Sequence, residues 1–449
     1  MRADTIERYA DRPLPRYTSY PTAPHFRPTV GTGSYRQWLE AVPPASDASL
    51  YLHLPFCRSM CWYCGCHTTV TARDEPIAAY VDALEREIDL VANALPGRIV
   101  AKHIHFGGGT PTLMQPAQFL ALMEKLRDRF DISSDAEIAI EIDPRTLEQP
   151  MVDALAIGGI NRASLGVQSF DPVVQRAINR VQTFDETHAA VAKLRRAGIA
   201  AINFDLIYGL PYQTVESCLD TAARSLELEP DRFAVFGYAH VPTFKLHQRK
   251  IQESALAGGA KRHAQAEAIA AALVGADFQR IGLDHYARSN DALAIAAENG
   301  ELHRNFQGYT TDASEILIGF GASSIGRLPQ GYVQNAVLIG DYQRRIVEGK
   351  LAVGKERPFA PEDQLRAAVI ERIMCDYRVD LDEVCARFNA DPDTLLAKCA
   401  IDQLFADGIA RRDHNVIAIA DGARPLVRVL AAAFDQYLGE APARHSRAV

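Results

Sequence analysis

Apolar residues recur along the first half of the chain in two alternating patterns. Short apolar or alternating runs, bounded by glycine, proline and polar residues, predict strands. Longer stretches with apolar residues three and four positions apart predict amphipathic helices between them. The predicted strands are residues 49–55, 101–106, 137–142, 162–168, 201–207 and 232–238, and the clearest helices are residues 76–95, 116–130, 186–197 and 214–228. Strands and helices therefore alternate through most of this region.

This repeat predicts an α/β fold with a parallel sheet, because strands joined by helices pair side by side through right-handed crossovers. A complete eight-fold (β/α) barrel takes about 250 residues, and the repeat covers fewer. We therefore expect a partial, six-unit (β/α) TIM-like barrel rather than a doubly wound sheet. In both architectures the active site lies at the carboxyl ends of the strands.

The patterning changes beyond the repeat and divides the chain into four segments. We expect an N-terminal extension at residues 1–48, the barrel core at residues 49–245, a barrel-completing and substrate-region segment at residues 246–355, and a mainly helical C-terminal domain at residues 356–449. Within the third segment, residues 278–283 predict a further strand. Residues 316–325 are expected to close the sheet or to line the site.

The C-terminal domain contains a signature of a winged helix. A turn at residues 413–415 separates two short strand-like runs, at residues 408–412 and 416–419, within an otherwise helical region. Winged helices often bind DNA, but this stretch has no basic surplus over the rest of the chain. We therefore favour packing, or a cover over the substrate, as its role.

Charge and hydropathy exclude several classes of partner. The 449-residue chain has a formal net charge of −8 at pH 7, so no overall basic field attracts nucleic acid or an anionic membrane. The first residues lack an apolar signal core, and no apolar run approaches the roughly 18 residues needed to span a bilayer. We therefore expect a cytoplasmic protein, and a monomer because there is no heptad repeat. An acidic substrate would need a local group of arginines and lysines.

The distribution of cysteines points to chemistry. Four of the eight lie close together at Cys57, Cys61, Cys64 and Cys66, and the first three have the spacing CxxxCxxC. Iron–sulfur clusters are held by thiolates, whereas structural zinc sites close four ligands, often as two separate CxxC pairs. The spacing favours an iron–sulfur cluster, with zinc and a redox thiol group as the alternatives. Three thiolates on a four-iron cube would leave one iron with an open position.

Polar residues also stand at the ends of successive predicted strands. Three glycines follow the second strand at residues 107–109, Glu141 and Gln168 close the third and fourth, and Asp205 lies within the fifth. Each has an ordinary alternative, such as a tight turn for the glycines or an internal ion pair for Glu141. Because parallel strands end at one edge of a sheet, their combination predicts a single ligand-binding rim.

With these features together, the chain resembles the radical S-adenosylmethionine (SAM) enzymes. Their signature is the CxxxCxxC of Cys57, Cys61 and Cys64, with the aromatic Tyr63 just before the last cysteine. Further motifs resemble one family among them, the oxygen-independent coproporphyrinogen III oxidases. These motifs are Cys66, RYTSYPT at residues 16–22, GGGTPT at residues 107–112, IYGLP at residues 207–211 and RNFQGYTT at residues 304–311.

The resemblance implies a radical oxidoreductase of haem (porphyrin) biosynthesis. Its cofactors would be one 4Fe–4S cluster and SAM, with two SAM molecules per chain. A 5'-deoxyadenosyl radical would take hydrogen from two propionates of coproporphyrinogen III, and loss of CO2 would leave the two vinyl groups of protoporphyrinogen IX. An electron donor such as flavodoxin or ferredoxin would reduce the cluster.

The resemblance also implies roles for individual residues. Cys57, Cys61 and Cys64 would bind the cluster, and Cys66 would have a catalytic role. The first SAM would be held by Tyr51, Tyr63, Gly108, Glu141 and Ile325, and the second by Gly109, Thr110, Gln168, Arg180, Asp205 and Ala239.

Three other interpretations of the sequence remain open. A haem-binding chaperone of the same superfamily would lack oxidase activity, but such relatives generally lack a cysteine at the position of Cys66 and carry an HNxxYW motif. A different radical SAM enzyme, such as a methyltransferase or a haem-degrading relative, would share the core and differ in its products. A structural zinc protein would contain zinc and no iron.

Overall fold

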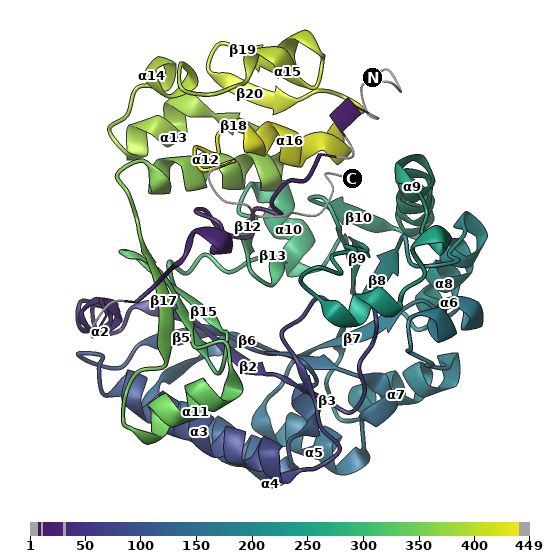
Figure 1. The fold of residues 1–449 in the computed structure, drawn as a ribbon, viewed down its shortest axis with the longest axis vertical. Helices are drawn as coiled ribbons and strands as arrows, with labels where there is room; N and C mark the ends of the chain where they lie inside the picture. Colours follow the sequence, from purple (N-terminus) through teal and green to yellow (C-terminus); the bar gives the residue numbers. More distant parts are fainter. Residues whose placement is uncertain (1–7, 10–11, 30–32, 440–449) are drawn as a thin grey trace.

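Six parallel strands form the centre of the main sheet, and they are the six that the sequence predicts (Figure 1). The computed structural model describes residues 8–9, 12–29 and 33–439. The strands, in order across the sheet, are β2 (Asp47–Leu54), β5 (Val100–Gly108), β6 (Asp131–Ile142), β7 (Arg162–Gln168), β8 (Ala201–Tyr208) and β9 (Arg232–Gly237). The six-unit repeat is therefore confirmed.

The sheet continues beyond this repeat at both edges. Strand β14 (Ile316–Phe320) pairs parallel to β2, and β15 (Ile325–Leu328), β16 (Gly331–Asn335), β17 (Val353–Pro358) and β1 (Arg27–Pro28) follow as antiparallel neighbours. At the other edge β11 (His285–Arg288) and β10 (Phe278–Ile281) are antiparallel to β9. The predicted strand at residues 278–283 is confirmed. Residues 316–325 extend the sheet instead of closing it, since β1 and β10 end an open strand order.

Helices cover the outer face of the sheet (Figure 1). They are α3 (Glu75–Ala92), α4 (Pro116–Arg129), α5 (Gln149–Gly158), α7 (Phe184–Arg196) and α8 (Val215–Glu227). Helix α3 buries Ile77, Tyr80 and Leu84, which are among its apolar residues at helical spacing. Helix α7 begins at a capping box of Thr183 and Glu186, which satisfies two free backbone amides of its first turn. Apolar spacing and caps therefore place α3, α4, α7 and α8 as predicted, whereas α5 was not predicted.

Buried Glu87 ties α3 to the added strands. Its carboxylate accepts hydrogen bonds from the Gly321 amide at 2.7 Å, Asn335 Nδ2 at 2.6 Å and the Tyr342 hydroxyl at 2.8 Å. Burial raises the pKa of Glu87 to about 7. Three converging donors compensate a carboxyl group that would otherwise be costly to bury.

A second hydrophobic core lies in the C-terminal region (Figure 1). Its elements are α12 (Asp363–Asp376), α13 (Leu381–Arg387), α14 (Pro392–Leu396), α15 (Asp402–Ala406), α16 (Val427–Ala432) and the small sheet β18 (Arg378–Asp380), β20 (Val416–Ile419) and β19 (Ala410–Asp413). The hairpin of β19 and β20 confirms the two predicted strand-like runs. Leu14, Tyr17 and Tyr20 of the N-terminal segment join this core, and the Tyr17 hydroxyl donates to Asp435 at 3.0 Å.

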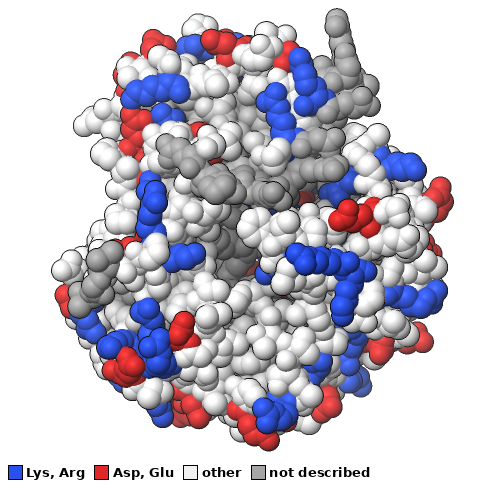
Figure 2. All heavy atoms as spheres, in the orientation of Figure 1, with Lys and Arg blue, Asp and Glu red and all other residues white. Residues whose placement is uncertain are grey.

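The remaining elements connect the two cores or pack beside them. They are α2 (Tyr35–Glu40), α6 (Pro172–Ala177), α9 (Gly259–Gly275), α10 (Ala292–Asn299), α11 (Ile339–Val347), the paired short strands β3 (Phe56–Cys57) and β4 (Thr69–Val70), and the hairpin of β12 (His303–Asn305) and β13 (Gly308–Thr310). Of the described helices, none has the length and apolar character needed to cross a bilayer. Figure 2 shows basic and acidic side chains interspersed on one face of the molecule. The domain boundaries themselves, including the part at residues 440–449 outside the described residues, stay a prediction.

Candidate functional site

The carboxyl ends of the parallel strands open into a cavity of about 590 Å³, a size typical of small-molecule sites. Most residues predicted to act in the site line it. They are Cys57, Cys61, Tyr63, Cys64, Cys66, Gly108, Gly109, Thr110, Glu141, Gln168, Arg180, Asp205 and Ala239. The structure thus brings the predicted rim together from five strands and the cysteine loop.

Two predicted cofactor residues, Tyr51 and Ile325, lie beside this cavity and not in its lining. The Tyr51 hydroxyl is hydrogen-bonded to His53 Nδ1 at 2.9 Å. Ile325 begins β15 next to Gly319, which pairs with Tyr51 across β14 and β2. Their roles toward SAM stay predictions.

Neighbouring segments hold the cysteine loop by its backbone. The Trp62 amide donates to the Ile178 carbonyl at 2.9 Å. The Cys64 carbonyl is 2.8 Å from His247 Nε2, and the Tyr63 carbonyl accepts from Gln248 Nε2 at 3.0 Å. The backbone groups of the loop bond to neighbouring segments, and the cysteine side chains line the cavity. Lys245, His247 and Gln248 support the loop, and sequence reasoning missed them because they lie far away in the chain.

Hydrogen-bond donors surround two of the thiols. Cys57 Sγ accepts from Thr68 Oγ1 at 3.2 Å and from Thr110 Oγ1 at 3.7 Å. Cys61 Sγ accepts from Arg180 Nη1 at 3.7 Å and from Arg145 Nη2 at 3.9 Å. Donors of this kind stabilise thiolate sulfur and the sulfur ligands of an iron–sulfur cluster. The residues therefore fit such a cluster.

The acidity of the remaining thiols differs. A side-chain hydrogen bond from Cys66 lowers the pKa of Cys64 to about 7. The same hydrogen bond, together with the charge of Cys64, raises the pKa of Cys66 well above the ordinary value. This hydrogen bond thus favours the thiolate form of Cys64 and the thiol form of Cys66.

Among the described residues, no three His, Cys, Asp or Glu side chains converge closely enough to bind a single metal ion. The zinc alternative is tested by metal analysis of the purified protein, which would find zinc and no iron if it holds.

An ion-pair group that sequence reasoning missed lies next to Cys61. Asp143 pairs with Arg145, and Arg180 Nη1 lies 3.3 Å from the same carboxylate. Burial alone would lower the pKa of Arg180, but Tyr63 and Asp143 raise it. Arg180 Nη2 donates to the Gly166 carbonyl at 2.7 Å, while its buried Nε has no hydrogen-bond partner within the described part of the chain. Asp143 and Arg145 lie two and four residues after Glu141, so the strand-end argument could have included them.

The carboxylate of Glu141 is held ionised at the rim. It accepts a hydrogen bond from the Gly108 amide at 3.0 Å, and His105 Nε2 lies 3.3 Å from its other oxygen. Burial alone would raise the pKa of Glu141, but the hydrogen bond and charge of His105 lower it. An ionised carboxylate in this cavity suits a cationic group such as the amine of an amino acid.

The three glycines permit close packing of the protein itself. A Cβ atom on Gly109 would lie 2.4 Å from the Phe56 carbonyl oxygen, and one on Gly108, at φ +115°, would lie 2.6 Å from the His53 ring. Only glycine avoids these contacts. The run thus lets the end of β5 approach the cysteine-bearing strand β3.

Asp205 lies deeper in the rim and binds two neighbours. Its carboxylate accepts from Ser164 Oγ at 3.1 Å and from Asn203 Nδ2 at 2.9 Å. Burial, followed by the charge of Glu141, raises the pKa of Asp205 to about 6. This carboxyl group is therefore protonated in the folded protein at pH values where the unfolded chain has already ionised it.

This pKa predicts a pH-dependent stability difference. As the pH rises from about 4 to about 7, the melting temperature of the wild type should fall relative to that of an Asp205→Asn variant. The reason is that Asp205 ionises more readily in the unfolded chain than in the folded protein over this window. Asparagine does not titrate, so the variant lacks the pH dependence that Asp205 and its coupling to Glu141 contribute. Thermal unfolding without SAM at several pH values tests this, with exposed Asp421→Asn as the control. Parallel curves for wild type and Asp205→Asn would contradict it.

The chain is similar to known proteins over its whole length. The family model of the radical SAM superfamily matches residues 51–224. The oxygen-independent coproporphyrinogen III oxidase of Bradyrhizobium diazoefficiens is 57% identical over 450 residues, which cover 100% of both chains. The protein of that name from Escherichia coli K12 is 40% identical and covers 94% of this chain.

The fold is similar over a comparable extent. The solved structure of coproporphyrinogen III oxidase (HemN) from Escherichia coli, described as a radical SAM enzyme, superposes with a TM-score of 0.89. The match covers 94% of this chain and 97% of that one, at 38% identity. These similarities confirm the partial barrel with an appended helical region. The chain therefore belongs to the oxygen-independent coproporphyrinogen III oxidase family of the radical SAM superfamily.

Proposed function

We propose that this protein converts coproporphyrinogen III to protoporphyrinogen IX without oxygen, by oxidative decarboxylation of two propionates to vinyl groups. The main support is the 57% identity to an oxidase of this name across the complete chain. The site contributes a chemical reason, because the CxxxCxxC cysteines and Glu141 line one cavity at the strand ends.

The residues present suit the cofactors of this family. Cys57, Cys61 and Cys64 would hold a 4Fe–4S cluster, and ionised Glu141 would bind the amino group of a SAM molecule. When bound, the reduced cluster and SAM would supply a 5'-deoxyadenosyl radical. The buried donor of Arg180 suits the carboxylate of a second SAM, and the cavity of about 590 Å³ leaves room beside the cysteine loop.

The protein then positions one propionate at a time. A hydrogen atom would pass from the β-carbon to the 5'-deoxyadenosyl radical, and one further electron would pass to an electron acceptor. Release of CO2 then leaves a vinyl group. A flavodoxin or ferredoxin would reduce the cluster, and the protein would act as a cytoplasmic monomer.

The haem-binding chaperone is the second candidate, and no observation favours it. The similar curated proteins described above are named as oxidases over nearly their full length. Cys66 is also present and lines the cavity. Tight stoichiometric haem binding without turnover would be needed to revive this alternative.

An anaerobic product assay tests the proposed function. Reconstituted protein with SAM, reductant and coproporphyrinogen III is expected to form protoporphyrinogen IX, detected by mass spectrometry after oxidation to the porphyrin. Absence of vinyl product in protein that has an intact cluster and cleaves SAM would contradict the proposal.

A Cys66→Ser variant separates Cys66 from the cluster ligands. Because Cys57, Cys61 and Cys64 would supply the three cluster ligands without Cys66, we expect the variant to keep its iron content and its cleavage of SAM. Vinyl formation should fall at least 100-fold, since the group would act on the substrate side. Loss of iron from the variant would instead make Cys66 a cluster ligand.

A further inference from the structure

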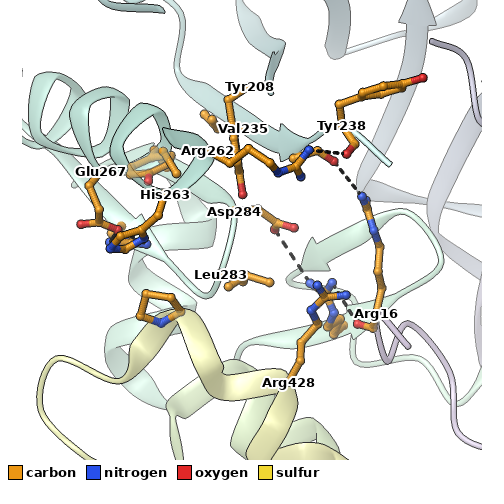
Figure 3. Close-up of a pocket in the computed structure, with 16 residues that line it drawn as sticks. Arg16, Tyr208, Val235, Tyr238, Arg262, His263, Glu267, Leu283, Asp284 and Arg428 are labelled. Atoms are coloured by element: carbon orange, nitrogen blue, oxygen red, sulfur yellow. Dashed lines mark hydrogen bonds and ion pairs between the residues drawn. The ribbon is translucent and has the colours of Figure 1, made fainter. Parts of the chain in front are cut away.

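A second, smaller cavity of about 70 Å³ adjoins the first and is lined by arginines (Figure 3). We call it the arginine pocket. Its guanidinium groups belong to Arg16, Arg262, Arg280, Arg304 and Arg428. The two cavities share Arg16, Gly237 and Tyr238 in their linings, so a bound molecule can extend from one into the other.

Arginines outnumber acidic side chains among the described residues that line this pocket. The acidic ones are Glu267, which lies 3.3 Å from Arg280, and Asp284, which lies 4.0 Å from Arg304 Nη1. Burial and the charges of Arg16 and Arg304 lower the pKa of Arg428 to about 10. The described lining is therefore rich in guanidinium groups, which suit an anionic ligand.

Arg304 also presents buried donors without acceptors. Its side chain is only 3% exposed. Nη2 donates to the Arg16 carbonyl at 3.3 Å, whereas Nε and Nη1 make no hydrogen bond to any described residue. Its guanidinium stacks over the Tyr309 ring at 4.3 Å, which fixes its orientation. Buried donors of this kind cost free energy, and an oxyanion ligand removes that cost.

Several separate parts of the chain build the pocket. Arg16 comes from the N-terminal segment, Arg262 from α9, Arg304 from β12 and Arg428 from α16 of the C-terminal region. Arg16 Nη2 donates to the Gly237 carbonyl at 3.1 Å and Arg262 Nη1 to the Tyr238 carbonyl at 2.8 Å. Both carbonyls lie at the end of β9, at the boundary with the large cavity. These hydrogen bonds hold the Arg16 and Arg262 side chains next to the large cavity.

We propose that the arginine pocket binds a propionate carboxylate of the substrate, one that is not being decarboxylated, and so positions the tetrapyrrole ring in the large cavity. This inference rests on the proposed function. A cavity of about 70 Å³ holds a carboxylate and excludes the ring. Guanidinium groups bind carboxylates through paired, charge-assisted hydrogen bonds. Phe306, two residues from Arg304, lines the large cavity and offers the ring an apolar face.

The test measures binding to reconstituted holoenzyme without reductant, so that no turnover occurs. Coproporphyrin III and its tetramethyl ester are titrated against the wild type, Arg304→Met and Arg428→Met, with fluorescence as the readout. Methionine keeps an apolar contact with Tyr309 and fills a similar volume. Arg411→Met on β19 is the control, because the Arg411 side chain is 65% exposed and lies 3.7 Å from Asp421.

We expect each pocket variant to bind coproporphyrin III at least tenfold more weakly, while its affinity for the ester changes less than twofold. The control should match the wild type with both probes. Equal losses for acid and ester would indicate a structural role and overturn the proposal, as would unchanged affinity for the acid. A variant that loses SAM affinity instead would assign the pocket to the SAM carboxylate.

Failure of the pocket assignment can be distinguished from failure of the proposed function. If the wild type binds the porphyrin and forms vinyl product while both variants bind like the wild type, only the pocket assignment falls. If the wild type neither binds coproporphyrin III nor forms product, the proposed function itself falls.

Discussion

A Cys61→Ser variant is expected to lose all anaerobic formation of protoporphyrinogen IX. Cys61 is the buried member of the CxxxCxxC set, and its sulfur accepts hydrogen bonds from Arg145 and Arg180. A serine hydroxyl is a poor ligand for iron, because the metal ligand is the thiolate and an alcohol is far less acidic than a thiol. With two thiolates remaining, the cluster should not be retained. Iron and sulfide content, visible absorbance and product yield would measure the loss.

Cys399→Ser is the matched control for this variant. Cys399 is a half-buried free cysteine in the C-terminal region, far along the chain from the cysteine loop and outside the cavity lining. Its replacement should leave iron content and product yield near the wild-type values. Full iron content together with vinyl formation in Cys61→Ser would remove Cys61 from the cluster ligands.

An Asp291→Ala variant is expected to lower the free energy of unfolding by about 3–5 kcal/mol. Asp291 is 7% exposed, and its carboxylate lies 2.7 Å from Arg232 and 3.5 Å from Arg162. Both arginines also pair with Glu137. Without Asp291, two buried guanidinium groups share one carboxylate. The variant also loses the cap that Asp291 provides to the Leu293 amide at the start of α10.

Asp421→Ala provides the comparison for Asp291→Ala. Asp421 also pairs with an arginine, at 3.7 Å, but its side chain is 93% exposed. Exposed ion pairs contribute about 0–1 kcal/mol, so this variant should unfold like the wild type. Chemical denaturation of both variants at pH 7 would measure the difference. Equal stabilities would show that the Asp291 network adds no more than a surface pair.

Local patterns account for the parts of the fold that the sequence predicts well. The strand and helix repeat follows from the spacing of apolar residues, because each buried face repeats with the period of its own element. Polar residues that interrupt this pattern at strand ends, such as Glu141, Gln168 and Asp205, could be recognised for the same reason. The parallel sheet then brings them to one rim.

Groups that depend on distant partners could not be predicted in this way. Glu87 looks like any charged residue in an amphipathic helix, yet it is buried under Asn335 and Tyr342. Arg145 and Arg180 meet at Asp143 only because β6 and the segment after β7 end side by side. The spacing of residues along a chain carries no information about which charged groups face each other across two elements.

The sequence by itself determined the alternating α/β repeat, the CxxxCxxC motif and the family, because these depend on local spacing and on motifs read in order. The tertiary structure alone decided which polar groups line one cavity, that Tyr51 and Ile325 lie beside it, and that arginines from several distant segments form a second pocket. The physical reason is that electrostatic and hydrogen-bond complementarity is set by distances of a few ångströms in space. Chain folding creates those distances between residues hundreds of positions apart.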